Sequence, residues 1–91
     1  MAEELTEILA ERGQAYGPFS THADITQQIK RVMKATPNWN HLTYAQCESL
    51  EMIAHKIGRI LNGDPNYADS WVDIAGYAQL IVQILVEGAK K

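Results

Sequence analysis

The chain has 91 residues, a net charge of −3 and one cysteine, so it has the length of a single domain and no intramolecular disulfide. Its acidic balance argues against binding to duplex nucleic acid, which requires a basic face to neutralise phosphates. The N-terminal segment is acidic and periodic, unlike a signal peptide, and no apolar run approaches the ~20 residues that span a bilayer, so we expect one cytoplasmic helical domain over residues 1–91 that does not bind membranes.

The N-terminal part of the chain predicts two helices separated by a tight turn. Apolar residues at helical spacing predict a first helix over residues 3–12, ended by Gly13. Gly17 and Pro18 disfavour a helix interior and predict a turn. A second helix is expected over about residues 20–35, with Ser20 or Thr21 as its N-cap. Its inward face would consist of Ile25, Ile29, Val32 and Met33.

The C-terminal part predicts a helical hairpin. Thr43 and Gln46 have the spacing of a capping box and predict the start of a third helix, which runs to about Asn62. The dense turn signal "NGDPNY" ends this helix, and a fourth is expected over residues 67–86. Strand-like alternation is absent from the sequence. The expected fold is therefore an all-α four-helix bundle whose last two helices form an antiparallel hairpin.

Four carboxylates occupy helical spacings on this hairpin, beside residues that belong to an apolar core. Glu48 and Glu51 lie on the third helix, and Asp69 and Asp73 on the fourth, so we expect them to converge across the hairpin, partly buried. Carboxylates held close together repel each other unless a cation compensates them. Two alternatives follow. These acids bind a hard cation such as Mg²⁺, or they pair with nearby basic groups, namely Lys56, Arg59 and His55.

The segment "LEMIAHKIGRILNGDPNYADSWVDIAGYA" resembles a family of small phage and prophage proteins of unassigned function, over about residues 11–86. It is also similar to the helical core of the MazG-like all-α nucleoside triphosphate pyrophosphohydrolases. In those enzymes an E-x-x-E element and an E-x-x-D element on successive helices bind Mg²⁺. Glu48 and Glu51 match the first element, whereas Asp69 and Asp73 replace the second with a spacing of four residues.

This resemblance implies Mg²⁺-dependent hydrolysis of a nucleoside triphosphate between its α and β phosphates, in the host cytoplasm if the protein is phage-encoded. A carboxylate such as Glu51 would act as base, and Lys56 and Arg59 would stabilise phosphate charge. The predicted nucleotide contacts are Arg12, Tyr16, His55, Asn62 and Tyr77.

Two alternative functions stay open beside catalysis. The protein could bind a nucleotide without turnover, as a sensor or sponge, or it could be a structural interaction module. Phe19 and His22 flank the same Gly-Pro turn as Tyr16, and the aromatic residues there could plug the end of the bundle instead of contacting a base. His55 could hydrogen-bond to the acids.

The fourth predicted helix has apolar residues on opposite sides. A chain this short has few elements to cover both sides. We therefore expect a homodimer or a larger homo-oligomer, with Trp71, Leu80 or Ile84 at the contact.

Overall fold

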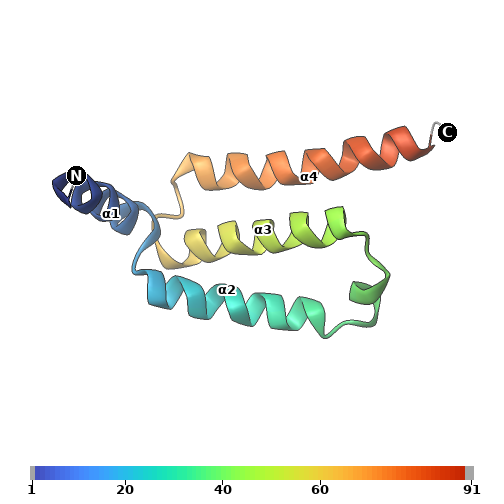
Figure 1. Cartoon of the computed structure of the whole chain (residues 1–91), viewed down its shortest axis with the longest axis horizontal. Helices are drawn as coiled ribbons and strands as arrows, with labels where there is room; N and C mark the ends of the chain where they lie inside the picture. The colour runs from blue at the N-terminus through green and yellow to red at the C-terminus, as the bar shows by residue number, and fades with distance from the viewer. Residues whose placement is uncertain (1, 90–91) are drawn as a thin grey trace.

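The computed structural model describes residues 2–89, and these residues are all-α (Figure 1). The elements in chain order are α1 (Ala2–Tyr16), α2 (Phe19–Lys34), the short 3-10 helix η1 (Pro37–His41), α3 (Tyr44–Asn62) and α4 (Ala68–Ala89). The predicted fold class is confirmed: the described part of the chain contains four α-helices, and α3 and α4 pack together as an antiparallel pair.

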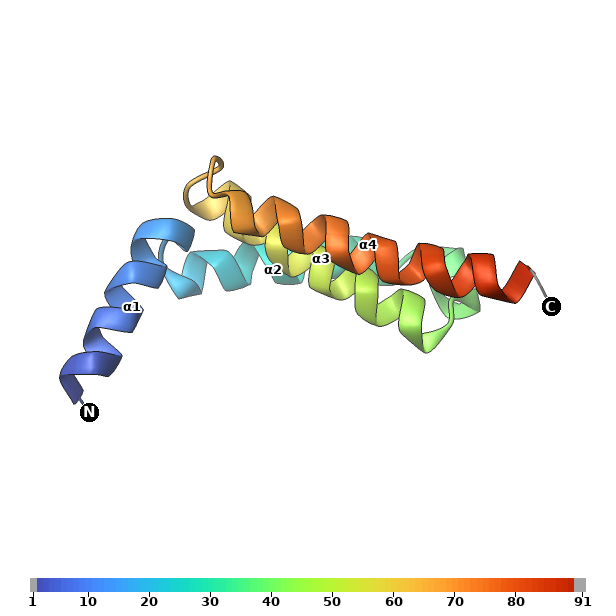
Figure 2. The ribbon, with the colours of Figure 1, turned by 90° about the horizontal axis from the view of Figure 1, so that it is seen from above.

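α3 is the central element, because α2 packs along one side of it and α4 along the other. α1 extends away from this layer at the end where α2 begins (Figure 2). The molecule is therefore elongated, with extents of 52 × 27 × 26 Å. This shape leaves a corner between α1 and the ends of α2 and α3, where the candidate site lies.

The turn between α1 and α2 begins later than the sequence predicted. Gly13 lies inside α1, so the prediction that it ends the helix was wrong. The helix ends before Gly17, whose φ of 77° is in the left-handed region that favours glycine. Pro18 follows as the N-cap of α2, without a side-chain capping bond. A lone glycine weakens a helix, but a left-handed residue followed by proline ends it.

The start of α3 is the predicted capping box. The Gln46 backbone N–H donates to the Thr43 hydroxyl at 3.1 Å, and the Thr43 N–H donates to Gln46 Oε1 at 2.9 Å. The end of α3 at Asn62 also agrees with the prediction. The segment before α3 forms η1, and α4 runs to Ala89, three residues beyond its predicted end.

The interior of the chain is small and partly polar. Within residues 2–89, Ala54 is the only buried hydrophobic residue, and the other buried side chains include His22 and Thr26 of α2. These two contact α3 at Gly58, where an added Cβ would overlap the Thr26 hydroxyl and approach the His22 ring to 3.1 Å. Val32, predicted to face inward, is 70% exposed. The close packing of α2 on α3 therefore depends on the absence of a side chain at Gly58. It does not depend on a large apolar core.

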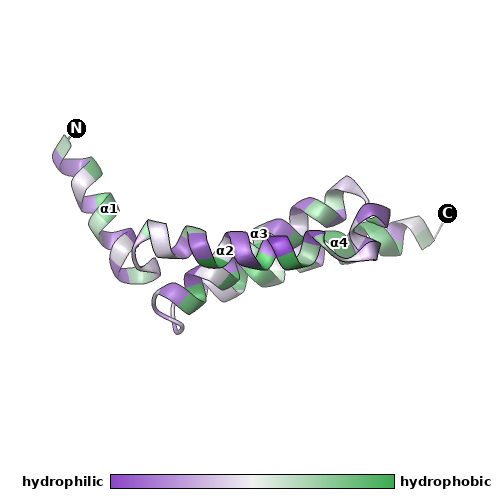
Figure 3. Ribbon diagram, turned by 90° about the horizontal axis from the view of Figure 1, so that it is seen from below, coloured by the Kyte–Doolittle hydropathy of each residue, from purple (hydrophilic) through white to green (hydrophobic). Residues whose placement is uncertain are grey.

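α4 is covered only along the line that faces α3. Six of its large apolar side chains are exposed besides Trp71, and Figure 3 shows hydrophobic segments along this helix. The exposed residues are Val72, Leu80, Val82, Ile84, Leu85 and Val86. By length and composition alone, α4 could also cross a membrane.

Candidate functional site

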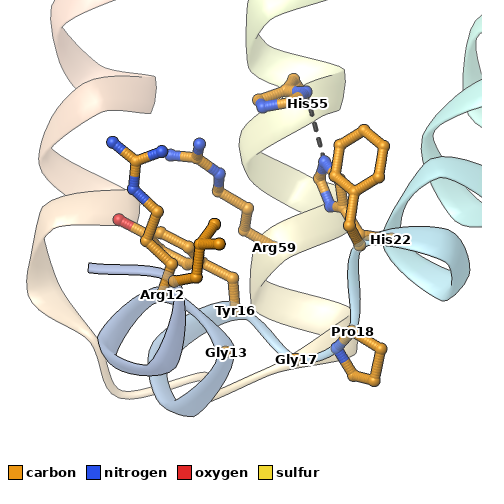
Figure 4. A pocket seen from close by; sticks show the side chains of 10 residues that line it. Arg12, Gly13, Tyr16, Gly17, Pro18, His22, His55 and Arg59 are labelled. Carbon is orange, nitrogen blue, oxygen red and sulfur yellow. Dashed lines mark hydrogen bonds between the residues drawn. The ribbon is translucent and has the colours of Figure 1, made fainter. Parts of the chain in front are cut away.

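A pocket with a volume of about 370 Å³ lies where α1, α2 and α3 meet (Figure 4). α1 and α3 contribute one arginine each, Arg12 and Arg59, and the turn and the start of α2 form the floor and the opposite wall. The other lining residues are Leu9, Gly13, Tyr16, Gly17, Pro18, Phe19, His22 and His55.

The end of α3 holds the α1–α2 turn in place. Asn62 Nδ2 donates hydrogen bonds to the carbonyl oxygens of Tyr16, at 2.9 Å, and Pro18, at 2.8 Å. The backbone N–H of Asp64 donates to the Ala15 carbonyl at 2.8 Å. Asn62, predicted as a nucleotide contact, therefore uses its amide group to shape the pocket from behind.

The pocket carries two positive charges without acidic partners. The guanidinium carbon of Arg59 lies 4.1 Å from the centroid of the Tyr16 ring, a cation–π contact that orients the side chain. In Figure 4 the Arg12 and Arg59 side chains extend in the same direction beside Tyr16. Across residues 2–89, neither arginine has a carboxylate oxygen within 4.0 Å. The pocket is therefore electropositive and suited to an anion.

The first turn of α2 adds to this character. Pro18 and Phe19 line the pocket at the N-terminal end of α2, which has no acidic residue in its first turn and no side-chain cap. The free N–H groups of a helix N-terminus carry partial positive charge. The field of α2 at its first residues therefore has the same sign as the two arginines.

Two histidines form the inner wall. His22 Nε2 lies 3.2 Å from His55 Nδ1, with the rings edge to face and their centroids 4.5 Å apart. Burial lowers the pKa of His55 to about 4, with further contributions from His22 and Arg59, and burial also lowers the pKa of His22. Both rings are neutral at pH 7, so one ring nitrogen can donate to the other. Among the residues that the structure describes, the buried His22 Nδ1 has no hydrogen-bond partner.

The four predicted acids are not gathered in the pocket. Glu51 pairs with Lys34 at 3.3 Å and Lys30 at 3.8 Å, both on α2, and Asp73 on α4 pairs with Lys56 at 2.9 Å. In the part of the chain that the structure describes, no three His, Cys, Asp or Glu side chains are placed to hold a metal ion. Glu48 and Asp69 are exposed. The magnesium site stays a prediction, and its carboxylates would first have to leave their lysine partners.

Arg12, Tyr16, His55 and Arg59 are the predicted site residues that the structure brings together. Two other predicted residues lie elsewhere. Lys56 is buried beside α4, and Tyr77 faces α3, where its carbonyl accepts a hydrogen bond from the Ser49 hydroxyl at 2.9 Å.

Sequence reasoning named Phe19 and His22 without placing them among the site residues. Phe19 is 77% exposed, so it does not plug the bundle. His22 pairs with His55, and within residues 2–89 His55 has no hydrogen bond to an acid. The "YGPF" turn, which contains Phe19 and is followed closely by His22, was the sequence feature that could have identified both as site residues.

The fold and pocket define a small all-α protein with a pocket lined by two arginines and by aromatic rings. The chain belongs to the family described as a domain of unknown function, DUF6378, which it matches over residues 1–85. Comparison with curated proteins and with solved structures gives no match. The family match contains no link to phage proteins or to MazG-like enzymes, so both resemblances stay predictions.

Proposed function

We propose that this protein binds a nucleotide in the pocket between α1, α2 and α3. The observation that carries the proposal is the pair of guanidinium groups, Arg12 and Arg59, which line one aromatic pocket and have no carboxylate partner within residues 2–89. Guanidinium groups match phosphate oxygens in a two-pronged geometry. The pocket volume of about 370 Å³ lies in the range of small-molecule sites, which is about 300–1,000 Å³.

Each part of a nucleotide has a matching group in the pocket. Arg12 and Arg59 would contact the phosphates, and the exposed Phe19 ring offers a flat surface on which a base can stack. His55 is neutral at pH 7, so it can offer a hydrogen bond to the base or sugar without adding charge. Tyr16 is already engaged by Arg59 and serves to orient it.

The enzymatic form of this proposal is Mg²⁺-dependent pyrophosphohydrolysis, which the resemblance to MazG-like enzymes implies. In the structure, Glu51 and Asp73 are each paired with lysines, and these acids lie outside the pocket. The geometry therefore favours nucleotide binding without turnover over hydrolysis. Mg²⁺ would be required for hydrolysis, whereas binding through two arginines needs no metal.

A thermal-shift series tests the binding proposal, because a ligand of the native state raises apparent stability. We expect nucleoside triphosphates to raise the melting temperature more than nucleosides or inorganic tripolyphosphate, since only the nucleotide uses both the arginines and the rings. Arg59→Gln and Arg12→Gln should abolish the shift. Arg31→Gln is the matched control, because Arg31 is an exposed arginine of α2 outside this pocket. An equal loss in the control would indicate nonspecific charge attraction.

The same samples separate binding from turnover. Each nucleotide is incubated with the protein, with and without Mg²⁺, and the products are resolved by chromatography. Binding without any product supports the binding protein, and monophosphate with pyrophosphate supports the enzyme. Absence of both binding and product would leave the structural interaction module as the remaining function.

A further inference from the structure

α4 carries an apolar line that no part of the described chain covers. The line is separate from the one facing α3, which contains the buried Ser70 and the half-buried Ile74 and Ile81. Its members are exposed and follow each other in alternating steps of four and three residues: Trp71, Ala75, Ala78, Val82, Leu85 and Ala89. This alternation is the spacing of a coiled-coil seam, and we call these six residues the α4 seam.

The chain exposes more surface than a folded monomer of its size. Folded proteins of 10.2 kDa have about 5,300 Å² of accessible surface by the usual size scaling, whereas this chain has 6840 Å². Its radius of gyration is 15.8 Å, against about 12 Å for a compact domain of this length. A stable interface buries about 800 Å² on each partner. The excess of about 1,500 Å² therefore exceeds what one stable dimer interface requires.

We propose that the α4 seam pairs with the α4 seam of a second copy of this chain, with the two helices antiparallel about a twofold axis midway between Ala78 and Val82. In this register each large seam residue faces an alanine. Trp71 faces Ala89 of the second copy, Leu85 faces Ala75, and Val82 faces Ala78.

The sizes of the seam residues select this orientation. Facing large and small side chains interdigitate without voids. A parallel pairing would place tryptophan against tryptophan and alanine against alanine, which combines overpacking with cavities. Antiparallel helices also bring opposite ends of their dipoles together.

The chemistry of the seam fits burial. None of its six residues is charged, and neither are the flanking Val72, Gln79 and Val86, so the pairing buries no ion. The indole N–H of Trp71 already donates to the Pro65 carbonyl at 2.8 Å, so covering the ring leaves no unpaired donor.

A groove beside the α4 seam is further evidence that a second copy of the chain binds there. Leu50 and Ile53 of α3 form one side, together with Leu42 from the segment before α3, and Ala78 and Ile81 of α4 form the other. The groove has a volume of about 290 Å³. Ala78 belongs to both the groove and the seam, so the two surfaces are continuous. A helix lying on the seam would extend over the groove. The assembly would place the α3–α4 hairpins of two copies against each other.

This interface is independent of the proposed nucleotide site, because α4 contributes no residue to that pocket. The first test is the mass in solution by sedimentation equilibrium. We expect the parent and Gln83→Glu to have twice the chain mass of 10.2 kDa. Ala78→Glu should be monomeric or unfolded, because it places a charge in the seam. Gln83 is exposed and outside the seam, so it controls for the added charge. A monomeric parent at high micromolar concentration would overturn the proposal.

Disulfide crosslinking tests the orientation without relying on a destabilised variant. In a Cys47→Ser background, Ala78→Cys and Val82→Cys are oxidised separately and after refolding together. Antiparallel pairing predicts crosslinked dimers only in the mixture. Efficient crosslinking of either variant alone, or none in the mixture, would contradict the register.

A vesicle experiment tests lipid as the other occupant of the seam. The parent is mixed with vesicles of phosphatidylcholine and phosphatidylglycerol, and we expect it to stay unbound in a flotation gradient. Flotation with the vesicles would show that lipid covers α4 and would overturn the proposal.

Discussion

Lys56 Nζ of α3 lies 2.9 Å from Asp73 Oδ2 of α4, and this ion pair joins the two helices of the C-terminal hairpin. Lys56 is only 8% exposed, so its ammonium group depends on this carboxylate for compensation. This ion pair explains why Asp73 lies beside core residues on α4, because its carboxylate neutralises the buried ammonium group of Lys56.

Asp73→Asn should therefore destabilise the protein, because it leaves Lys56 buried and unpaired. We expect a loss of about 2 kcal/mol in the free energy of unfolding, measured by denaturant titration; the partial exposure of Asp73 keeps the loss below that of a fully buried pair. Asp69→Asn should change stability by less than about 0.5 kcal/mol, because Asp69 is exposed. Unchanged stability of Asp73→Asn, with Mg²⁺-dependent stabilisation of the parent alone, would instead favour the predicted metal site.

Gly58→Ala should destabilise the protein although alanine is the better helix former. The new Cβ would overlap the Thr26 hydroxyl and press on the His22 ring, so α2 must move away from α3. We expect a net loss of about 1–2 kcal/mol, since overpacking outweighs the gain in helix propensity. Gly76→Ala on α4, where nothing lies within 4 Å, should raise stability by about 0.5–1 kcal/mol. Thermal melts compare the two variants, and an equal response would argue against close α2–α3 packing.

Asn62→Asp should loosen the α1–α2 turn. The amide nitrogen that donates to the Tyr16 and Pro18 carbonyls would become a carboxylate oxygen, which repels both. We expect a loss of about 2 kcal/mol and weaker nucleotide binding, since the turn lines the pocket. Hydrogen exchange should show faster exchange of amides at the end of α1. Asn66→Asp, an exposed change in the next turn, should leave these amides protected.

Stability should depend on pH through His55. Its pKa is about 4 in the folded protein and 6.5 ordinarily, so between these values the unfolded chain binds a proton that the folded chain does not. Stability should therefore be complete above pH 6.5, fall as the pH drops toward 4, and lose no more from this group below that value. We expect this group to contribute about 2 kcal/mol, after allowance for solvent screening of a half-buried ring.

His55→Gln tests this assignment, because it removes the titrating group. Its stability should fall less steeply over the same pH range than that of the parent, with the remaining slope partly due to His22, whose pKa is also lowered by burial. His41→Gln, at an exposed position in η1, should keep the slope of the parent. If His55→Gln and the parent had equal slopes, His55 would not be a source of the acid sensitivity.

Four of the ten residues that line the pocket could be predicted as site residues from the sequence. Arg12, Tyr16, His55 and Arg59 were named as phosphate or nucleotide contacts from their chemistry and from the Gly-Pro turn, and the structure brings them into one pocket. The partnership of His22 with His55 could not be predicted, because these residues are 33 positions apart and meet only where Gly58 lets α2 approach α3.

The sequence by itself determined the local features of this protein. The capping box at Thr43, the end of α3 at Asn62 and the all-α class depend on hydrogen bonds and apolar spacing within one helix, which neighbouring residues specify. Only the tertiary structure decided which acid meets which cation. Helical spacing determines on which face of its own helix Glu51 or Asp73 lies. The rotation and separation of the neighbouring helices determine which lysine each acid meets. These depend on packing between residues that are distant in the chain.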